Sequence, residues 1–287
     1  MDSQPLAYLD PGFLESEEAR PIRILAEYLE PLDRFKAQNI QDTVVFFGSA
    51  RIHSREAAEQ ALERLEKRAG RRATAEHEEM VARSRKAVEW SRYYEEAREL
   101  AGLLTTWSNS LESTHHRFVV TSGGGPGIME AANRGAYEAG GKTIGLNIRL
   151  PFEQGANRYI TDGLHFEFHY FFMRKFWFAY LAKALVIFPG GFGTLDEMFE
   201  ILTLMQTEKL EKQIQIILYG TDYWDPIVNL KPMEDWGAIT PGDIELVQRA
   251  NTPSEAFELL KTHLTEHHLM PPTIQEMKAP GIAKTRS

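Results

Sequence analysis

Short apolar runs alternate with helical patterns along most of the chain. Each run is almost wholly apolar, which is typical of strands that are buried on both faces of a parallel sheet. The runs are TVVFFG from Thr43, RFVVTSGGG from Arg117, KTIGLNI from Lys142, ALVIFPGG from Ala184 and IQIILYG from Ile214. Because helical segments separate them, the pattern predicts an α/β fold with a doubly wound parallel sheet.

Helical patterns also occupy the N-terminal third of the chain. Residues 22–37 predict one helix, interrupted by Pro31. The charged segment 54–108 predicts a helical hairpin with a break at Gly70 and a second arm over residues 74–101. We expect this arm to pack against another subunit or along the body of the protein. The alternative is a solvated surface insertion with no role in activity.

These patterns divide the chain into three parts. Residues 1–40 are expected to form an N-terminal helical extension, and residues 41–269 a single domain with the helical insertion at about 54–108. Residues 270–287 are polar and contain prolines, so we expect a loosely ordered tail.

Composition and charge narrow the classes of function. Hydrophobic residues make up 43% and charged residues 25% of the chain, as in globular rather than disordered proteins. The net charge of −9 argues against a broad surface for nucleic acid or for a membrane. The absence of cysteine excludes disulfides, thiolate nucleophiles and cysteine-ligated metals. The acidic start lacks a secretory signal pattern and no apolar run has membrane-spanning length, so we expect a cytoplasmic protein.

Two glycine-rich loops carry the strongest functional signal. SGGGPG at Ser122–Gly127 and PGGFGT at Pro189–Thr194 each follow an apolar strand and precede a helix. In parallel sheets ligands bind at the carboxyl ends of the strands, where these loops fall. Bare backbone N–H groups at a helix N-terminus favour an anion. The two loops together predict a phosphate-bearing ligand.

Two common nucleotide-binding motifs do not fit. The dinucleotide fingerprint fails because Ile128 stands where its third glycine is needed, and KTIGLNI offers no acidic residue for a ribose. AYEAGGKT at Ala136–Thr143 matches a relaxed phosphate-loop pattern, but it follows a helix and precedes a strand. Gly140 and Gly141 are therefore interpreted as a helix C-cap.

Glu197 is the first candidate for a catalytic group. It lies in the expected first turn of the helix after PGGFGT, close to where the sugar of a bound phosphate ester would lie. The spacing Thr194-x-x-Glu197 equally fits a capping box, so the spacing alone leaves both roles open. Asp196 next to it suits the positive end of the helix dipole.

Arg174 and Lys175 interrupt the otherwise aromatic and apolar stretch FHYFFMRKFWFAYLAK. The pair either reaches to solvent or lines a pocket in which aromatic neighbours stack on a base. His165 and His169 lie in the alternating run LHFEFHY, which predicts a strand, where the two rings would be too far apart to share a metal. We therefore expect no metal site.

Several of these motifs are similar to those of the LOG family of cytokinin-activating nucleotide hydrolases, whose members are often labelled "possible lysine decarboxylase". The similarity rests on FFGSAR from Phe46, SGGGPGIMEAANRGA from Ser122, the Arg174–Lys175 pair and PGGFGTLDE from Pro189. It covers roughly residues 43–218 apart from the hairpin, and it implies a Rossmann-like domain. It also implies Arg174 and Glu197 as catalytic residues, and a substrate site formed by Gly48, Ser49, Gly124, Gly125, Met129, Lys175, Gly190, Gly191, Gly193 and Thr194.

The resemblance implies hydrolysis of the N-glycosidic bond of a nucleoside 5′-monophosphate, AMP or an N6-substituted AMP, to free base and ribose 5-phosphate. We expect no cofactor, no nucleic-acid or membrane partner, and a homo-oligomer of two or more subunits. The alternative function is a carrier or sensor that binds a nucleotide or molybdenum cofactor in the same pocket without turnover. A third alternative, a structural protein whose helical hairpin recruits partners, would leave both glycine loops unexplained. The decarboxylase label has no support, because nothing in the sequence identifies a Schiff-base lysine.

Overall fold

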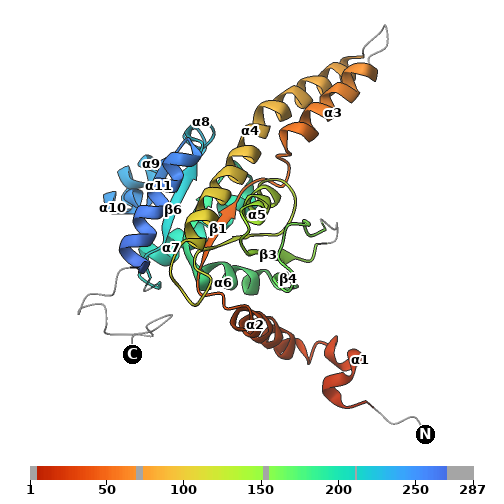
Figure 1. Cartoon of the computed structure of the whole chain (residues 1–287), viewed down its shortest axis with the longest axis vertical. Helices are drawn as coiled ribbons and strands as arrows, with labels where there is room; N and C mark the ends of the chain where they lie inside the picture. The colour runs from red at the N-terminus through yellow and green to blue at the C-terminus, as the bar shows by residue number, and fades with distance from the viewer. Residues whose placement is uncertain (1–4, 69–73, 151–154, 211, 270–287) are drawn as a thin grey trace.

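The computed structural model describes residues 5–68, 74–150, 155–210 and 212–269. Their centre is a seven-stranded sheet in the order β4-β3-β2-β1-β5-β6-β7, and every neighbouring pair is parallel (Figure 1). This confirms the predicted α/β fold and the five apolar strands. The strands are β1 (Thr43–Phe47), β2 (Val119–Ser122), β3 (Thr143–Ile148), β4 (His165–Phe168), β5 (Ala182–Ile187), β6 (Gln215–Tyr219) and β7 (Val247–Ala250).

Helices connect the strands and cover both faces of the sheet. Ahead of β1 lie a 3-10 turn (Ala7–Leu9), α1 (Pro11–Leu14) and α2 (Arg20–Ala37). The others are α3 (Arg55–Arg68), α4 (Ala75–Asn109), α5 (Ile128–Glu138), α6 (Phe171–Leu181), α7 (Phe192–Gln206), α8 (Thr221–Trp224), α9 (Lys231–Asp235), α10 (Pro241–Glu245), α11 (Pro253–Leu264) and a π-helical segment (Thr265–Leu269).

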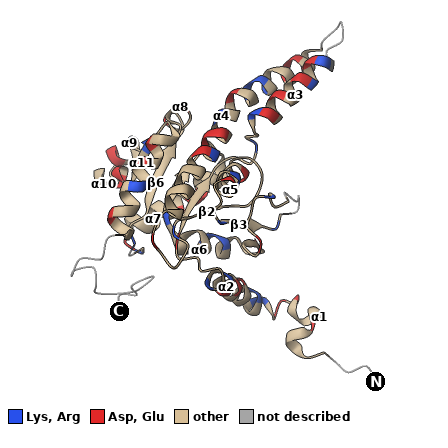
Figure 2. Cartoon of the chain, viewed as in Figure 1, with Lys and Arg blue, Asp and Glu red and all other residues tan. Residues whose placement is uncertain are grey.

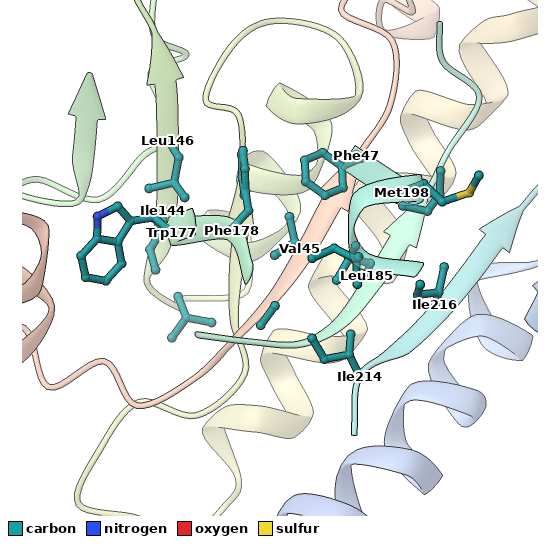
Figure 3. Packing of buried hydrophobic residues seen from close by; sticks show 14 of the residues in the cluster. Val45, Phe47, Ile144, Leu146, Trp177, Phe178, Leu185, Met198, Ile214 and Ile216 are labelled. Atoms are coloured by element: carbon teal, nitrogen blue, oxygen red, sulfur yellow. The ribbon is translucent and has the colours of Figure 1, made fainter. Parts of the chain in front are cut away.

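Alternation along β1 produces two separate cores. Val45 and Phe47 face one side, where they pack with Trp177 and Phe178 of α6 and Met198 of α7 (Figure 3). Val44 and Phe46 face the opposite core, which is closed by α4, α5 and α11. A sheet that is buried on both faces has continuous apolar strands, as the sequence predicted.

Helix α4 contains 35 residues, a length of about 52 Å at the rise of an α-helix. Its inner part is the crossover between β1 and β2, and Tyr94, Ala97, Leu100 and Leu104 are buried there in the core. Its outer part projects from the body together with α3 (Figure 1) and carries many charges of both signs (Figure 2). The prediction of packing along the body is confirmed for the inner part, and the segment 54–108 is a surface insertion only in its outer part.

The N-terminal helix differs from the prediction in its continuity. α2 runs unbroken through Pro31, which is buried, whereas the sequence predicted an interruption there. The helix is held against α6, because the indole Nε1 of Trp177 donates to the carbonyl of Glu27 at 2.9 Å and Phe35 packs in the core. This packing compensates for the backbone hydrogen bond that proline cannot make.

Some predictions concern residues outside the described ranges, namely the break at Gly70 and the loosely ordered tail 270–287. The division into three parts also stays a prediction. The helix C-cap is confirmed, since α5 ends at Glu138 and Gly140 takes a positive φ of 72° directly after it. None of the helices described combines the length and the apolar character needed to cross a bilayer.

Candidate active site

The candidate site lies at the carboxyl edge of the sheet, where the strand order reverses between β1 and β5. Three loops meet there, and Ser49 after β1 joins them. Its backbone N–H donates to the carbonyl of Pro189 at 2.9 Å, and its own carbonyl accepts from the N–H of Ile128 at 3.1 Å. The structure therefore brings the ends of β1, β2 and β5 together, as the resemblance implied.

Glycine is required where the loop after β2 approaches the loop after β1. Gly127 has φ 72° and ψ −134°, a conformation that is open almost only to glycine. A Cβ at this position would lie 2.3 Å from the carbonyl oxygen of Ser49. Gly48 is constrained in the same way, because its Cβ would lie 2.7 Å from Ile128. The close approach of the two loops therefore depends on both glycines.

Replacing Gly127 with Ala is expected to lower the free energy of unfolding by on the order of 1–3 kcal/mol, through backbone strain combined with the clash. Urea denaturation measures the change. Gly140→Ala is the matched control, since Gly140 also has φ 72° but an added Cβ there meets no atom within 4 Å. Equal losses in the two variants would contradict a specific requirement at the loop contact.

A network of polar side chains supports the loop after β2, and none of its members was predicted as a site residue. The amide of Asn157 donates to the carbonyls of Gly124 and Gly125 at 3.0 and 3.1 Å. The Oδ1 of Asn133 accepts from Asn157 at 2.9 Å and from the hydroxyl of Ser122 at 2.7 Å. Only the position of Asn133 inside the SGGGPGIMEAANRGA motif could have indicated this network.

The other predicted binding residues lie along the same edge. Met129 packs against the first glycine of the loop, with its sulfur 2.7 Å from where a Cβ of Gly123 would be. Gly190 is buried and fits closely against Thr194, whereas Gly191 and Gly193 are exposed and an added Cβ at either meets nothing within 4 Å. The backbone of these two glycines is therefore open to a ligand.

The predicted capping box is absent. α7 begins at Phe192 with Gly191 as its N-cap, so Thr194 is the third and Glu197 the sixth residue of the helix. No side chain caps this end, and the N–H of Thr194 donates to the carbonyl of Gly191. The N-cap is Gly191, three residues before Thr194, the N-cap that the Thr-x-x-Glu spacing would require. The capping role is thus wrong, and the carboxylate of Glu197 is available for other contacts.

Glu197 instead forms an ion pair with Arg174 of α6. Nη2 of Arg174 lies 3.2 Å from Oε1 of Glu197, and the two side chains are only 16% and 6% exposed. The guanidinium lies near the rings of Phe171 and Phe178, at 5.2 and 5.6 Å from their centroids. Its Nε is buried without a partner among the described residues. The two predicted residues are therefore in contact, in an aromatic and largely buried surrounding.

Burial shifts the pKa of both members of this pair. It raises the pKa of Glu197 to about 7, and the nearby charges of Arg174 and Lys175 only partly oppose this effect. Burial also lowers the pKa of Arg174, against the attraction of Glu197. A carboxyl group that titrates near neutrality at the carboxyl edge of a parallel sheet is typical of a catalytic acid or base.

Lys175 contacts two other carboxylates of α7. Its Nζ lies 2.8 Å from Asp196 and 2.9 Å from Glu200, and its side chain is 19% exposed. Burial lowers the pKa of Lys175, but hydrogen bonds to the two carboxylates outweigh it and the net pKa is raised. Asp196 thus pairs with a lysine rather than serving mainly the helix dipole. Direct contact of Lys175 with substrate stays a prediction. In the structure its ion pairs link α6 to α7.

The two histidines considered as metal ligands lie on or directly after β4. His165 is exposed on this strand, as the alternating pattern predicted, and His169 follows its end. Within the described ranges, no three His, Asp or Glu side chains are grouped so as to hold a metal ion.

Comparison with known proteins supports the family suggested by the motifs. Residues 129–260 match the family model described as "Possible lysine decarboxylase", the label that LOG proteins carry. The resemblance to the LOG family is confirmed. A probable cytokinin riboside 5′-monophosphate phosphoribohydrolase of Oryza sativa subsp. japonica is 26% identical over 153 residues, which cover 52% of this chain and 61% of the relative.

Two further LOG relatives come from a plant and a bacterium. The cytokinin riboside 5′-monophosphate phosphoribohydrolase of Arabidopsis thaliana is 27% identical over 158 residues, covering 52% of this chain and 69% of that protein. The protein of the same name from Rhodococcoides fascians is 29% identical over 126 residues, covering 43% of this chain and 62% of its own length. This chain therefore matches about three fifths to two thirds of the length of these LOG proteins.

Solved structures with a similar chain path include two proteins of molybdenum cofactor biology. The Moco carrier protein of Chlamydomonas reinhardtii has a TM-score of 0.45 and 19% identity, covering 79% of this chain and 99% of that chain. The molybdenum cofactor binding protein of Rippkaea orientalis has a TM-score of 0.42 and 22% identity, covering 60% and 88%. Likeness at this level carries no information about function.

Proposed function

We propose that the protein hydrolyses the N-glycosidic bond of a nucleoside 5′-monophosphate, AMP or an N6-substituted AMP, to free base and ribose 5-phosphate. The observation that carries the proposal is the buried Arg174–Glu197 pair, in which Arg174 of α6 contacts Glu197 of α7, the helix that the PGGFGT loop opens. The activity for which the LOG relatives are named is of the same class.

The chemistry of the reaction suits a buried carboxylate at this place. Cleavage of the bond between sugar and base builds positive charge on the ribose, in an oxocarbenium-like transition state. An ionised Glu197 beside the sugar would stabilise that charge or accept a proton from the attacking water. Arg174 would keep the carboxylate oriented and would offer its remaining N–H groups to a ribose hydroxyl or to the phosphate.

The glycine loop supplies the partner for the 5′-phosphate. Exposed backbone at Gly191 and Gly193 adjoins the first turn of α7, where unpaired N–H groups and the positive end of the helix dipole favour an anion. A phosphate bound there would leave the sugar within reach of Glu197, which lies one turn further along the same helix. A phosphate site followed by a carboxylate beside the sugar suits a substrate that carries its phosphate on the 5′ carbon.

Among the described residues, the lysine at this edge of the sheet does not suit the Schiff-base chemistry of a lysine decarboxylase. Lys175 is held by two carboxylates and its pKa is raised, so it is a poor amine nucleophile. Lys183 and Lys212 have lowered pKa values because of burial, to about 7 for Lys212. Lys183 is the second residue of β5, and Lys212 lies three residues before β6. Both are therefore at the amino edge of the sheet, away from the glycine loops.

The raised pKa of Glu197 predicts the pH dependence of the reaction. If the ionised carboxylate is the active form, kcat/KM should rise with pH through about 7, the pKa of Glu197, and level off above it. Initial rates between pH 5 and 9 with AMP would measure the profile. A rate that is already maximal at pH 5 would contradict a requirement for deprotonation of this group.

The decisive test is chromatographic detection of free base from a panel of nucleoside 5′-monophosphates that includes AMP and isopentenyl-AMP. We expect base and ribose 5-phosphate in equal amounts, and no release from the corresponding nucleosides at similar concentration. Tight nucleotide binding without release from any member of the panel would replace the hydrolase with a carrier or sensor. The expected homo-oligomer and the cytoplasmic location stay predictions.

A further inference from the structure

The short helix α8 is bonded to both ends of the turn that follows β5. The hydroxyl of Tyr223 donates to the carbonyl of Gly190 at 2.8 Å, inside the PGGFGT loop. The indole Nε1 of the next residue, Trp224, donates to the carbonyl of Ile187 at 3.0 Å, at the end of the strand. Trp224 is fully buried, so α8 is a fixed support beside the loop.

Helix α4 in turn holds α8 in place. The rings of Trp90 and Tyr223 meet edge to face with centroids 5.4 Å apart. The hydroxyl of Tyr93 donates to Asp222 at 2.5 Å, and Arg92 pairs with the same carboxylate. Trp90, Arg92 and Tyr93 lie near the middle of α4 (Ala75–Asn109), at the start of its buried inner part.

The ring of Tyr223 is not packed on every side. A cavity of about 710 Å³ lies between α4 and α8 and is lined by Trp90, Tyr93, Asp222 and Tyr223, among others. The phenol is held by the edge of Trp90, by the hydrogen bond to Gly190 and by an edge-to-face contact with Trp224 at 4.9 Å between centroids. The ring is partly buried against the core, and its remaining side faces the cavity.

The hydrogen bond to Gly190 has a direct consequence for the loop. A trans peptide points its C=O and the following N–H in opposite directions, and the described chain contains no cis peptide. Fixing the carbonyl of Gly190 toward Tyr223 therefore aims the N–H of Gly191 away from α8. Gly191 is exposed there and is the N-cap of α7, at the position assigned above to the phosphate.

We propose that Tyr223 is a positioning residue that fixes the Gly190–Gly191 peptide of the PGGFGT loop, and that Trp90 of α4 holds Tyr223 for this purpose. The effect on catalysis rests on the proposed function, because it assumes that this loop binds the 5′-phosphate. The effect on the conformation of the loop does not depend on the proposed function.

Tyr223→Phe tests the hydroxyl while the ring stays in place. We expect KM for the 5′-monophosphate to rise about tenfold, equivalent to about 1.4 kcal/mol, with kcat nearly unchanged. This split is expected because a phosphate contact is made equally in the ground state and in the transition state. The matched control is Tyr137→Phe, since Tyr137 on α5 is 59% exposed, and it should leave both constants unchanged.

Hydrogen exchange of the peptide that covers residues 188–197 provides a readout that does not require turnover. Tyr223→Phe should speed exchange at the amides of Thr194 and Leu195, which donate to the carbonyl of Gly191. Trp90→Leu should have a smaller effect in the same direction, and Trp90→Phe should largely restore the wild-type rate because an aromatic edge remains.

The possible results separate the two proposals. Faster loop exchange together with a raised KM supports the role of Tyr223. Faster exchange in a protein whose wild type releases no base supports the positioning role but ends the hydrolase proposal. Unchanged loop exchange in Tyr223→Phe overturns the positioning role, whether or not the wild type is active. A fall in kcat with KM unchanged overturns the link to phosphate binding.

Discussion

Replacing Glu197 with Gln is expected to lower kcat for base release by on the order of 10²–10⁴-fold while the protein remains folded, because glutamine keeps the shape of the side chain but cannot carry the charge. Single-turnover assays with AMP, combined with thermal unfolding, measure both effects. Glu200→Gln is the matched control, since Glu200 lies one turn further along α7 and contacts Lys175 instead of Arg174. Equal activity in the two variants would remove Glu197 from the chemistry.

The same substitution has an expected signature in stability. Because the pKa of Glu197 is raised to about 7, the folded protein binds this proton more tightly than the unfolded chain does. Its contribution to stability is therefore full at low pH and is lost as the pH rises through about 7. Glutamine does not ionise, so the Tm of the variant relative to wild type should increase between pH 5 and pH 8. A constant difference in Tm would contradict the raised pKa.

Loss of Arg174 is expected to have the second largest effect. Arg174→Gln removes the positive charge next to Glu197, which should raise the pKa of the carboxyl further and move the rise of the pH–rate profile to above pH 7. We expect kcat/KM at pH 7 to fall by about 10²-fold or more, since one charge-assisted contact with the transition state is lost as well.

Arg174→Lys separates charge from geometry. Lysine keeps the positive charge but lacks the planar group that lies near Phe171 and Phe178, so it should restore the pH profile more fully than the rate. Arg149→Lys is a control on a surface arginine whose side chain is 71% exposed. An unchanged profile in Arg174→Gln would show that this arginine does not act on Glu197.

The sheet was largely predictable from sequence because each central strand is apolar on both faces. β7 was missed because only its two end residues, Val247 and Ala250, are buried, which leaves too little apolar pattern. The sequence left open whether the long arm packs along the body or is a surface insertion, because the buried inner part of α4 continues into a charged, solvated part. The sequence shows one continuous helical pattern for the inner and the outer part of α4. Only the folded structure shows which part packs against the sheet.

The position of the two glycine loops at the carboxyl edge of the sheet was predictable, because each loop directly follows an apolar strand, whereas the catalytic roles of Arg174 and Glu197 stay predictions. The capping box was wrong because Thr194-x-x-Glu197 lies wholly inside a helix that begins at Phe192. Tyr223 could not be found from sequence, because its contact with Gly190 joins residues that are 33 positions apart and belong to no shared motif.

The position of β1 at the centre of the sheet also affects how the chain reaches its native state. Val44 pairs with Val120 on one side and with Ala184 on the other, so the first strand to be synthesised gains its partners only much later. Contacts between such distant residues carry a large loop-closure cost and slow the folding of parallel sheets. We therefore expect refolding from urea to be slow, with β1 exposed until β5 docks, and dilute solutions or a chaperone to increase the recovered yield.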